Sequence, residues 1–210
     1  MAKIIAFLNH KGGVSKTTSA LNVGKLLHDD GEKVILVDTD VQRSAMKYAD
    51  NNEDMPFPVI GIDGHKNITN SIKQLSGDYD WIIVDGAAKA QEMTASLLKA
   101  VDLIVIPVKT SQIELDGVED IVDMIKIRQE IADGMPAAAF QVSMIQPNTQ
   151  IGRDIFEVLE AYELPILKGG IYQRIGHANA SGYGGFGVDV DKRIKEEYTN
   201  MLEQIKEAFE

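Results

Sequence analysis

The nine residues from His10 to Thr18, HKGGVSKTT, constrain the fold more than any other stretch of the sequence. They follow a short apolar run, KIIAFLN, and lead into SALNVGKLL, whose apolar residues recur with helical spacing. A glycine-rich turn between a strand and a helix exposes consecutive backbone N–H groups, and these bind anions together with the helix N-terminus. The stretch therefore predicts a phosphate-binding loop in an α/β fold.

The residue types within this loop predict how it binds phosphate. Gly12 and Gly13 let the backbone pass close to phosphate oxygens. Lys16 is placed to reach the β- and γ-phosphates of a nucleotide, and Thr17 to bind Mg²⁺ through its hydroxyl. The eight residues KGGVSKTT, set between a strand and a helix, are a much stronger signal than a pair of glycines alone.

Ser15 stands where such loops normally carry a glycine just before the lysine. If this position requires a positive φ, a serine costs on the order of 1–2 kcal/mol, whereas at negative φ the cost is small. The backbone N–H is retained in either case. We therefore expect a working nucleotide site, and Ser15→Gly should tighten nucleotide binding by no more than about tenfold, or roughly 1.4 kcal/mol.

Apolar runs rich in valine and isoleucine alternate with longer stretches of helical period, as in strands buried on both faces of a parallel sheet. The expected strands are residues 4–8, 34–37, 58–61, 81–84, 103–107 and 138–144, with a weaker one near Ile166. The expected helices are residues 17–29, 42–49, 67–74, 92–99, 113–132 and 152–162. This order predicts a single α/β domain over residues 1–210, with an open, mostly parallel sheet and helices on both faces.

Composition excludes several classes of protein. The 210 residues contain no cysteine, which rules out disulfides and cysteine-ligated zinc or iron–sulfur sites. No apolar run approaches the roughly 20 residues that span a bilayer, and the N-terminus is better interpreted as a strand than as a signal peptide. A cytoplasmic location is expected. The net charge of −11 argues against a protein that coats nucleic acid with its whole surface, but it leaves room for a local basic patch.

The C-terminal part of the chain predicts one more helix, from about Asp191. Its apolar residues fall on one face at a period of 3.6: Ile194, Tyr198, Met201, Leu202, Ile205 and Phe209. We expect this face to pack on the sheet. Helices that lie on membranes favour lysine and arginine on the polar face, whereas glutamates crowd it here, so no membrane role is expected. The glycine-rich residues 181–187, SGYGGFG, are expected to form a flexible surface loop.

Three aspartates follow strands and are expected near the phosphate loop. VILVDTDVQ contains Asp38 and Asp40 after its apolar run, and YDWIIVDGAA contains Asp85. In an open α/β sheet, ligands collect at the carboxyl ends of the strands. An aspartate after an apolar strand can hold Mg²⁺ through water, and Asp40 could orient a water against the γ-phosphate. Each aspartate alone could be a strand-end cap, but their joint occurrence with the loop favours a nucleotide site.

These segments resemble a known family. KGGVSKTT, DTDVQ and WIIVD are similar to the deviant Walker A, switch I and Walker B segments of the ParA/MinD family of P-loop ATPases, and Lys11 ahead of the glycines matches the family's signature lysine. The later segments IPVKTSQIELDGVEDIVDMI and GGIYQRIGHANASGYGGFGVDV resemble the family more loosely. Because the chain begins at its first strand and has no cysteine, the resemblance is greatest to the small ParA-type partition ATPases.

The resemblance implies a set of site residues. ATP would drive a sandwich dimer in which Lys11 reaches the partner's nucleotide, and Asp40 would position the attacking water. Thr17, Asp38 and Asp85 would serve Mg²⁺. Asn148, in QPNTQ, would contact the adenine, and the alternative interpretation of this residue is a turn. The expected catalytic residues are Lys11, Lys16 and Asp40, and the nucleotide would also be held by Gly12, Gly13, Val14, Ser15, Lys16, Thr17 and Thr18.

The resemblance also implies partners, namely nonspecific DNA, bound by the ATP dimer at the nucleoid, and a centromere-binding protein of the ParB type. Neutralising several DNA phosphates requires basic residues on one face. The candidates are Arg153, Lys168, Arg174, Lys192, Arg193 and Lys195. Scattered surface charge is the alternative interpretation of these residues.

Two other functions are compatible with the motifs. The first is a metabolic P-loop enzyme, such as an ATP-dependent ligase resembling dethiobiotin synthetase, which would need a further substrate pocket and would not need Lys11. The second is a nucleotide-binding scaffold that has lost hydrolysis. Asp40 and Lys11 argue against the scaffold, while Ser15 argues mildly for it.

Overall fold

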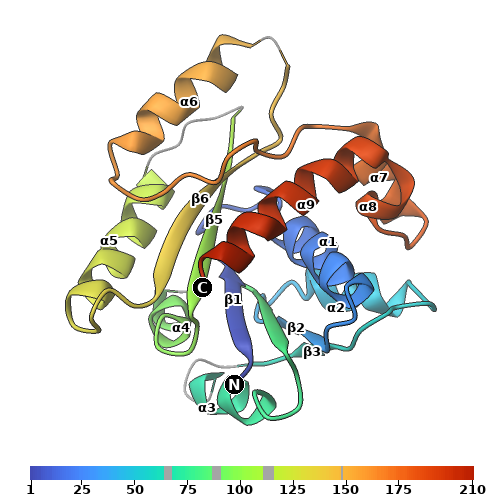
Figure 1. The fold of residues 1–210 in the computed structure, drawn as a ribbon, viewed down its shortest axis with the longest axis horizontal. Helices are drawn as coiled ribbons and strands as arrows, with labels where there is room; N and C mark the ends of the chain where they lie inside the picture. The colour runs from blue at the N-terminus through green and yellow to red at the C-terminus, as the bar shows by residue number, and fades with distance from the viewer. Residues whose placement is uncertain (64–67, 87–90, 111–115, 148) are drawn as a thin grey trace.

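The fold is seen in a computed structural model, which describes residues 1–63, 68–86, 91–110, 116–147 and 149–210 (Figure 1). Within these residues no helix is long and apolar enough to cross a membrane.

Six parallel strands form one sheet in the order β3-β2-β4-β1-β5-β6. They are β1 (Lys3–Phe7), β2 (Val34–Asp38), β3 (Val59–Gly61), β4 (Trp81–Asp85), β5 (Leu103–Lys109) and β6 (Ala137–Ser143). The apolar runs of β2 and β4 are buried at every position, because helices cover both faces of the sheet. The open parallel sheet expected from the sequence is therefore confirmed.

The helices form two layers. One face of the sheet packs on α1 (Lys16–Asp29), α2 (Ser44–Asp50), α8 (Gly187–Val190) and α9 (Lys192–Glu207). The other face packs on α3 (Ile68–Leu75), α4 (Gln91–Leu97), α5 (Asp116–Glu130) and α6 (Gln150–Glu160). The expected helices recur within a few residues of these bounds; residue 67 and residues 113–115 of the expected ranges lie outside the described residues.

The last helix packs as expected. Ile194, Tyr198, Met201, Leu202 and Ile205 of α9 are buried in the same apolar cluster as α1. Phe209, just beyond the helix, meets Trp81 edge-on with the ring centroids 5.2 Å apart. Because this apolar face is buried against the sheet, α9 has no free apolar face to place on a membrane.

The glycine-rich segment differs from the expected surface loop. Helix α7 (Ile175–Gly182) includes its first two residues, and α8 begins at its last residue. Phe186 between them is only 4% exposed and packs against Tyr48 and Phe57, with ring centroids 5.8 and 6.1 Å away. The prediction of a surface position holds for Tyr183, which is 91% exposed. It fails for the helical ends and for Phe186, where tertiary packing supplies the order that glycine-rich stretches lack by propensity.

The strand expected near Ile166 is also absent from the described residues as a regular element. The chain there makes two isolated bridges instead, Phe140 to Ile166 and Ile145 to Tyr172. These bridges bring the segment before α7 alongside the end of β6, where it borders the phosphate loop.

Candidate functional site

The sheet register brings the candidate site residues together. Phe7 at the end of β1 and Asp38 at the end of β2 both pair with Asp85 at the end of β4. Since the phosphate loop continues from β1, both carboxylates lie at the edge of the sheet where the loop turns into α1. The meeting of these three segments, which the sequence predicts, is therefore present.

The loop adopts a backbone that settles the question of Ser15. Gly13 has φ 70° and Ser15 has φ 75°, so both lie in the left-handed region. A serine there carries a steric cost that a glycine would avoid, on the order of 1–2 kcal/mol. A Cβ built on Gly12 or Gly13 would meet nothing within 4 Å, so the space in front of these two residues is open to a ligand.

Asn9 holds the loop in place, and the sequence interpretation missed it. Its Nδ2 donates to the carbonyl of Pro107 over 2.7 Å, and its Oδ1 accepts from the backbone N–H of Lys11 over 2.9 Å. Asn9 thereby ties the start of the loop to β5. The available signal was an asparagine directly after an apolar strand, a residue type that often organises the following turn.

Lys16 lies buried within the loop, only 7% exposed. Its Nζ donates to the carbonyl of Lys11 over 2.8 Å. Burial lowers the pKa of Lys16, and the charges of Asp85 and Asp40 oppose that shift. The site thus holds a desolvated cation beside an acidic cluster, which suits it to bind the oxygens of an anionic group.

Thr17 and Asp85 form the central contact of the site. The Thr17 hydroxyl donates to Asp85 Oδ2 over 2.6 Å. Asp85 is 1% exposed, and its Oδ1 is buried without a hydrogen-bond partner in the described part of the chain. Burial, with a smaller contribution from the charges of Asp38 and Asp40, raises its pKa to about 7, against the Thr17 hydrogen bond and Lys16. A hydroxyl beside a buried carboxylate oxygen without a partner fits a water-coordinated Mg²⁺.

Asp38 has a different set of partners from Asp85. Its Oδ2 accepts from the N–H groups of Ala45 and Met46 over 2.9 and 3.1 Å, and its Oδ1 accepts from Asp40 N–H over 2.9 Å. The carboxylate therefore caps the N-terminus of α2. That Asp38 also helps to bind Mg²⁺ stays a prediction.

Asp40 lies on the turn between β2 and α2. Its backbone N–H bonds Asp38, and its Oδ1 accepts from the N–H of Gln42 over 2.9 Å. The turn therefore holds the Asp40 carboxylate at the mouth of the site, beside the charge of Lys16. This position is compatible with the predicted role in orienting a water.

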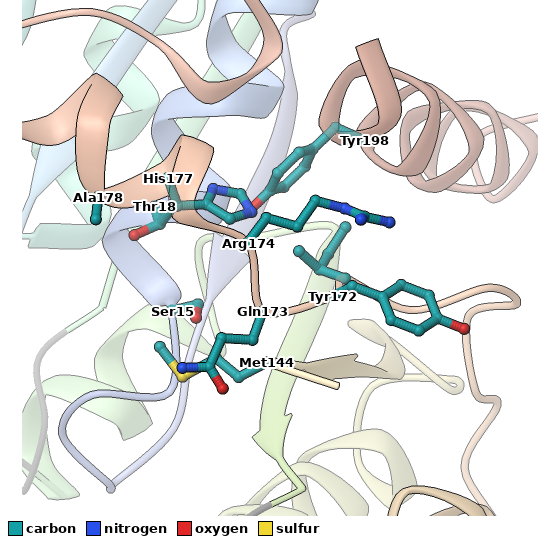
Figure 2. Close-up of a pocket in the computed structure, with 10 residues that line it drawn as sticks. Ser15, Thr18, Met144, Tyr172, Gln173, Arg174, His177, Ala178 and Tyr198 are labelled. Atoms are coloured by element: carbon teal, nitrogen blue, oxygen red, sulfur yellow. The ribbon is translucent and has the colours of Figure 1, made fainter. Parts of the chain in front are cut away.

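A cavity of ≈ 290 Å³ opens beside the loop (Figure 2). Of its lining residues, the sequence placed only Ser15 and Thr18 at the nucleotide site, because the others come from distant segments. The other lining residues are Met144, Ile171, Tyr172, Gln173, Arg174, His177, Ala178 and Tyr198. Asn148, expected to contact the adenine, lies outside the described residues.

Arg174, a candidate for the DNA-binding patch, is engaged within the protein. Its guanidinium forms an ion pair with Glu197, whose other carboxylate oxygen accepts from the N–H of Tyr172 over 3.1 Å. The hydrogen bond to Glu197 raises the pKa of Arg174. Arg174 thus helps to fix the wall of the cavity, and its part in a DNA-binding patch stays a prediction.

Comparisons with known proteins agree with this geometry. The family described as AAA domain matches residues 2–56 and 52–134. The sporulation initiation inhibitor protein Soj of Bacillus subtilis is 25% identical over 203 residues, covering 77% of this chain and 80% of that protein. The chromosome-partitioning ATPase Soj of Thermus thermophilus is 24% identical over 188 residues, covering 75% and 76%. A Cyanothece McdA variant in complex with ATP has the same fold, with a TM-score of 0.81, 15% identity and coverage of 99% of this chain and 96% of that chain.

Ser15→Gly should stabilise the fold. The change removes the left-handed strain at φ 75°, while the extra freedom of glycine in the unfolded chain offsets part of the gain. We expect the free energy of unfolding in urea to rise by roughly 1 kcal/mol. Ser15→Ala keeps the Cβ and should leave stability within about 0.5 kcal/mol of wild type. Equal free energies of unfolding for wild type, Ser15→Gly and Ser15→Ala would contradict backbone strain at Ser15.

The buried Asp85 carboxyl should give stability a specific pH dependence without Mg²⁺. Its pKa is about 7 in the folded chain, whereas an unfolded aspartate titrates near about 3.9. The folded state therefore holds the proton more tightly, and the contribution of Asp85 to stability falls as the pH rises from about 4 to about 7.

Asp85→Asn removes the ionisable carboxyl, so the variant does not share this fall in stability with rising pH. The melting temperature of the variant, relative to wild type, should therefore rise between about pH 4 and about pH 7 in a chelating buffer and level off above about pH 7. Asp78→Asn, at an exposed aspartate, is the control and should show a constant difference. A constant difference for Asp85→Asn as well would argue against the raised pKa.

Proposed function

Because this chain belongs to the AAA domain family, and within it to the ParA-type P-loop ATPases, we propose that it binds ATP with Mg²⁺ and hydrolyses it as a positioning switch. The observation that carries the proposal is the Thr17–Asp85 hydrogen bond of 2.6 Å beside the buried Lys16. A metal-bound triphosphate requires a carboxylate oxygen, a hydroxyl and a desolvated ammonium, and the Asp85 Oδ1 that would serve it has no partner among the described residues.

The phosphates would occupy the open space in front of Gly12 and Gly13. Lys16 Nζ, which donates to the Lys11 carbonyl in this structure, would donate to the β- and γ-phosphate oxygens instead of that carbonyl or in addition to it. Backbone N–H groups as far as Thr18 would complete the cradle at the start of α1. The nucleoside would then enter the cavity beside Ser15 and Thr18.

Thr17, Asp85 and Asp38 would hold Mg²⁺, which would supply positive charge against the charge of the phosphates. Thr17 is the direct ligand in this proposal, while Asp85 and Asp38 act through water. Asp40 would orient the attacking water at the mouth of the site. Since phosphoryl transfer needs mainly positioning and charge stabilisation, these residues suffice without a covalent intermediate.

Lys11 would contribute in a dimer. It stands ahead of the two glycines, and its carbonyl and N–H are already used by Lys16 and Asn9. Its side chain would reach the nucleotide of a second subunit and stabilise charge there, as an arginine finger does. Hydrolysis would then depend on the dimer, which is the property that a switch needs.

The cargo would be plasmid or chromosomal DNA, handled with a centromere-binding partner of the ParB type. Support comes from the name of the Thermus thermophilus relative, a chromosome-partitioning ATPase. Lys192 and Lys195 are exposed on the first turns of α9 and would contact DNA phosphates in the ATP-bound dimer. Lys192 lies 3.5 Å from Glu196, but both side chains are exposed, so this ion pair is weak.

ATP turnover tests the site directly. Lys16→Ala should weaken ATP binding by at least about tenfold, because it removes the buried cation. Asp40→Ala should still bind ATP but hydrolyse it at least about tenfold more slowly, equivalent to roughly 1.4 kcal/mol in the barrier. Binding is measured by calorimetry and hydrolysis by phosphate release, with Asp54→Ala as a control at an exposed aspartate.

The same measurements separate the rival functions. Hydrolysis at the wild-type rate by Asp40→Ala would contradict its assignment. Binding of ATP without hydrolysis by wild type, even with DNA, would favour the scaffold. Turnover with only ATP, Mg²⁺ and DNA would count against a metabolic ligase, which needs a second substrate.

DNA binding should appear with ATP, not ADP, and should weaken steeply with salt. Removing two phosphate contacts with Lys192→Ala and Lys195→Ala should reduce the slope of log K against log salt by about 1.8. The matched control is Lys73→Ala with Lys99→Ala, two exposed lysines near the helix layer on the opposite face. Equal DNA binding in both nucleotide states, or an unchanged slope, would contradict the patch.

A further inference from the structure

Two cavities meet beside the first turn of α1. The cavity of ≈ 290 Å³ described above adjoins a second one of ≈ 190 Å³. The second lies between α1, α2 and the segment from α7 to α8, and hydroxyls of Thr17, Ser44 and Tyr48 line it. Thr18 and His177 line both cavities, so the imidazole stands where the two spaces join.

The imidazole of His177 has no hydrogen-bond partner among the residues that the structure describes. Both Nδ1 and Nε2 are buried, and neither has a partner within the described residues. The ring meets Tyr198 edge-on, with the centroids 6.0 Å apart, and this contact fixes the plane of the ring rather than its polar atoms. Because an unpaired buried polar group is costly, a ligand that pairs with it gains affinity.

His177 has the chemistry to pair with a neutral hydroxyl. Burial lowers its pKa and the charge of Arg174 lowers it further, while Asp191 opposes both. The ring is therefore neutral near pH 7, with one N–H donor and one acceptor nitrogen. A hydroxyl matches that pair, whereas a phosphate would prefer a protonated imidazole.

Gly187 lies close against one side of the ring. A Cβ at Gly187 would lie 3.1 Å from His177 Nδ1 and 3.2 Å from Asn22 Oδ1. Asn22 is itself engaged, since its Oδ1 accepts from the N–H of Val188 over 3.0 Å. The glycine therefore keeps the ring uncrowded without giving it a partner.

The position of His177 selects the part of a nucleotide that it meets. Figure 2 shows His177 and Thr18 together at one side of the cavity, with Met144 and Gln173 on the opposite side. When the phosphates are on the loop, the group next to Thr18 is the sugar, and the base extends farther into the cavity. The ribose hydroxyls are therefore the groups within reach of the imidazole.

We propose that His177 is a specificity-determining residue that hydrogen-bonds a ribose hydroxyl, so that the site prefers ribonucleotides to deoxyribonucleotides. The inference rests on the proposed binding of ATP, which it deepens by assigning the recognition of the sugar. It adds a contact from α7 to a site otherwise built at the ends of β1, β2 and β4.

Calorimetry with ATP, 2′-deoxy-ATP and 3′-deoxy-ATP tests the inference. Wild type should bind at least one deoxy analogue about 2- to 12-fold more weakly than ATP, the equivalent of one hydrogen bond of roughly 0.5–1.5 kcal/mol. His177→Phe keeps a ring against Tyr198 but removes both nitrogens, so the analogue and ATP should then bind equally. His28→Phe, at an exposed histidine at the end of α1, should keep the wild-type preference.

The outcomes separate this inference from the proposed function. Absence of ATP binding by wild type would overturn the proposed function. Equal affinities of wild type for ATP and both analogues would overturn only the role of His177, as would an undiminished preference in His177→Phe. If His177→Phe does not fold, His177→Gln is measured instead. Its amide keeps N–H donors and an acceptor oxygen, so part of the preference should remain, and a preference as large as that of wild type would overturn the role of the imidazole.

Discussion

The hydrogen bond between the Thr17 hydroxyl and the buried Asp85 carboxylate is the interaction on which the site depends. It joins the first turn of α1 to the end of β4, and it exists because Phe7 and Asp85 are paired in the parallel register. A shift in the register of β1 against β4 would separate the phosphate loop from the Asp85 carboxylate. The fold therefore positions the metal-binding and phosphate-binding groups through the sheet rather than through the loop alone.

The balance of charge around this bond explains why the site suits a metal-bound anion. Burial raises the pKa of Asp85 and lowers that of Lys16, so each group is costly to keep charged on its own. Asp38 gives its carboxylate to three backbone N–H groups, which couples the start of α2 to the same edge of the sheet. A ligand that supplies both cation and phosphate would complete the partnerships of Asp85 and Lys16.

The C-terminal segment closes the site from the other side. Tyr48 of α2 donates to the carbonyl of Gly185, and Phe186 packs beneath it, so α2 and the segment from α7 to α8 are held together. Arg174 and Glu197 brace the cavity wall in the same region. The glycine-rich stretch thus forms part of the wall of a cavity, and Arg174, a candidate DNA contact, is ion-paired with Glu197 in the same region.

The sequence by itself determined the open parallel sheet, the phosphate loop and the convergence of Asp38, Asp40 and Asp85, because each depends on local periodicity and on the rule that parallel strands end at one edge. Tertiary structure alone decided the left-handed φ of Ser15, the anchoring by Asn9 and the placement of His177 beside Thr18. The local sequence does not predict these three features. They arise from hydrogen bonds and packing between segments as far apart as residues 18 and 177, and only the folded chain brings those segments together.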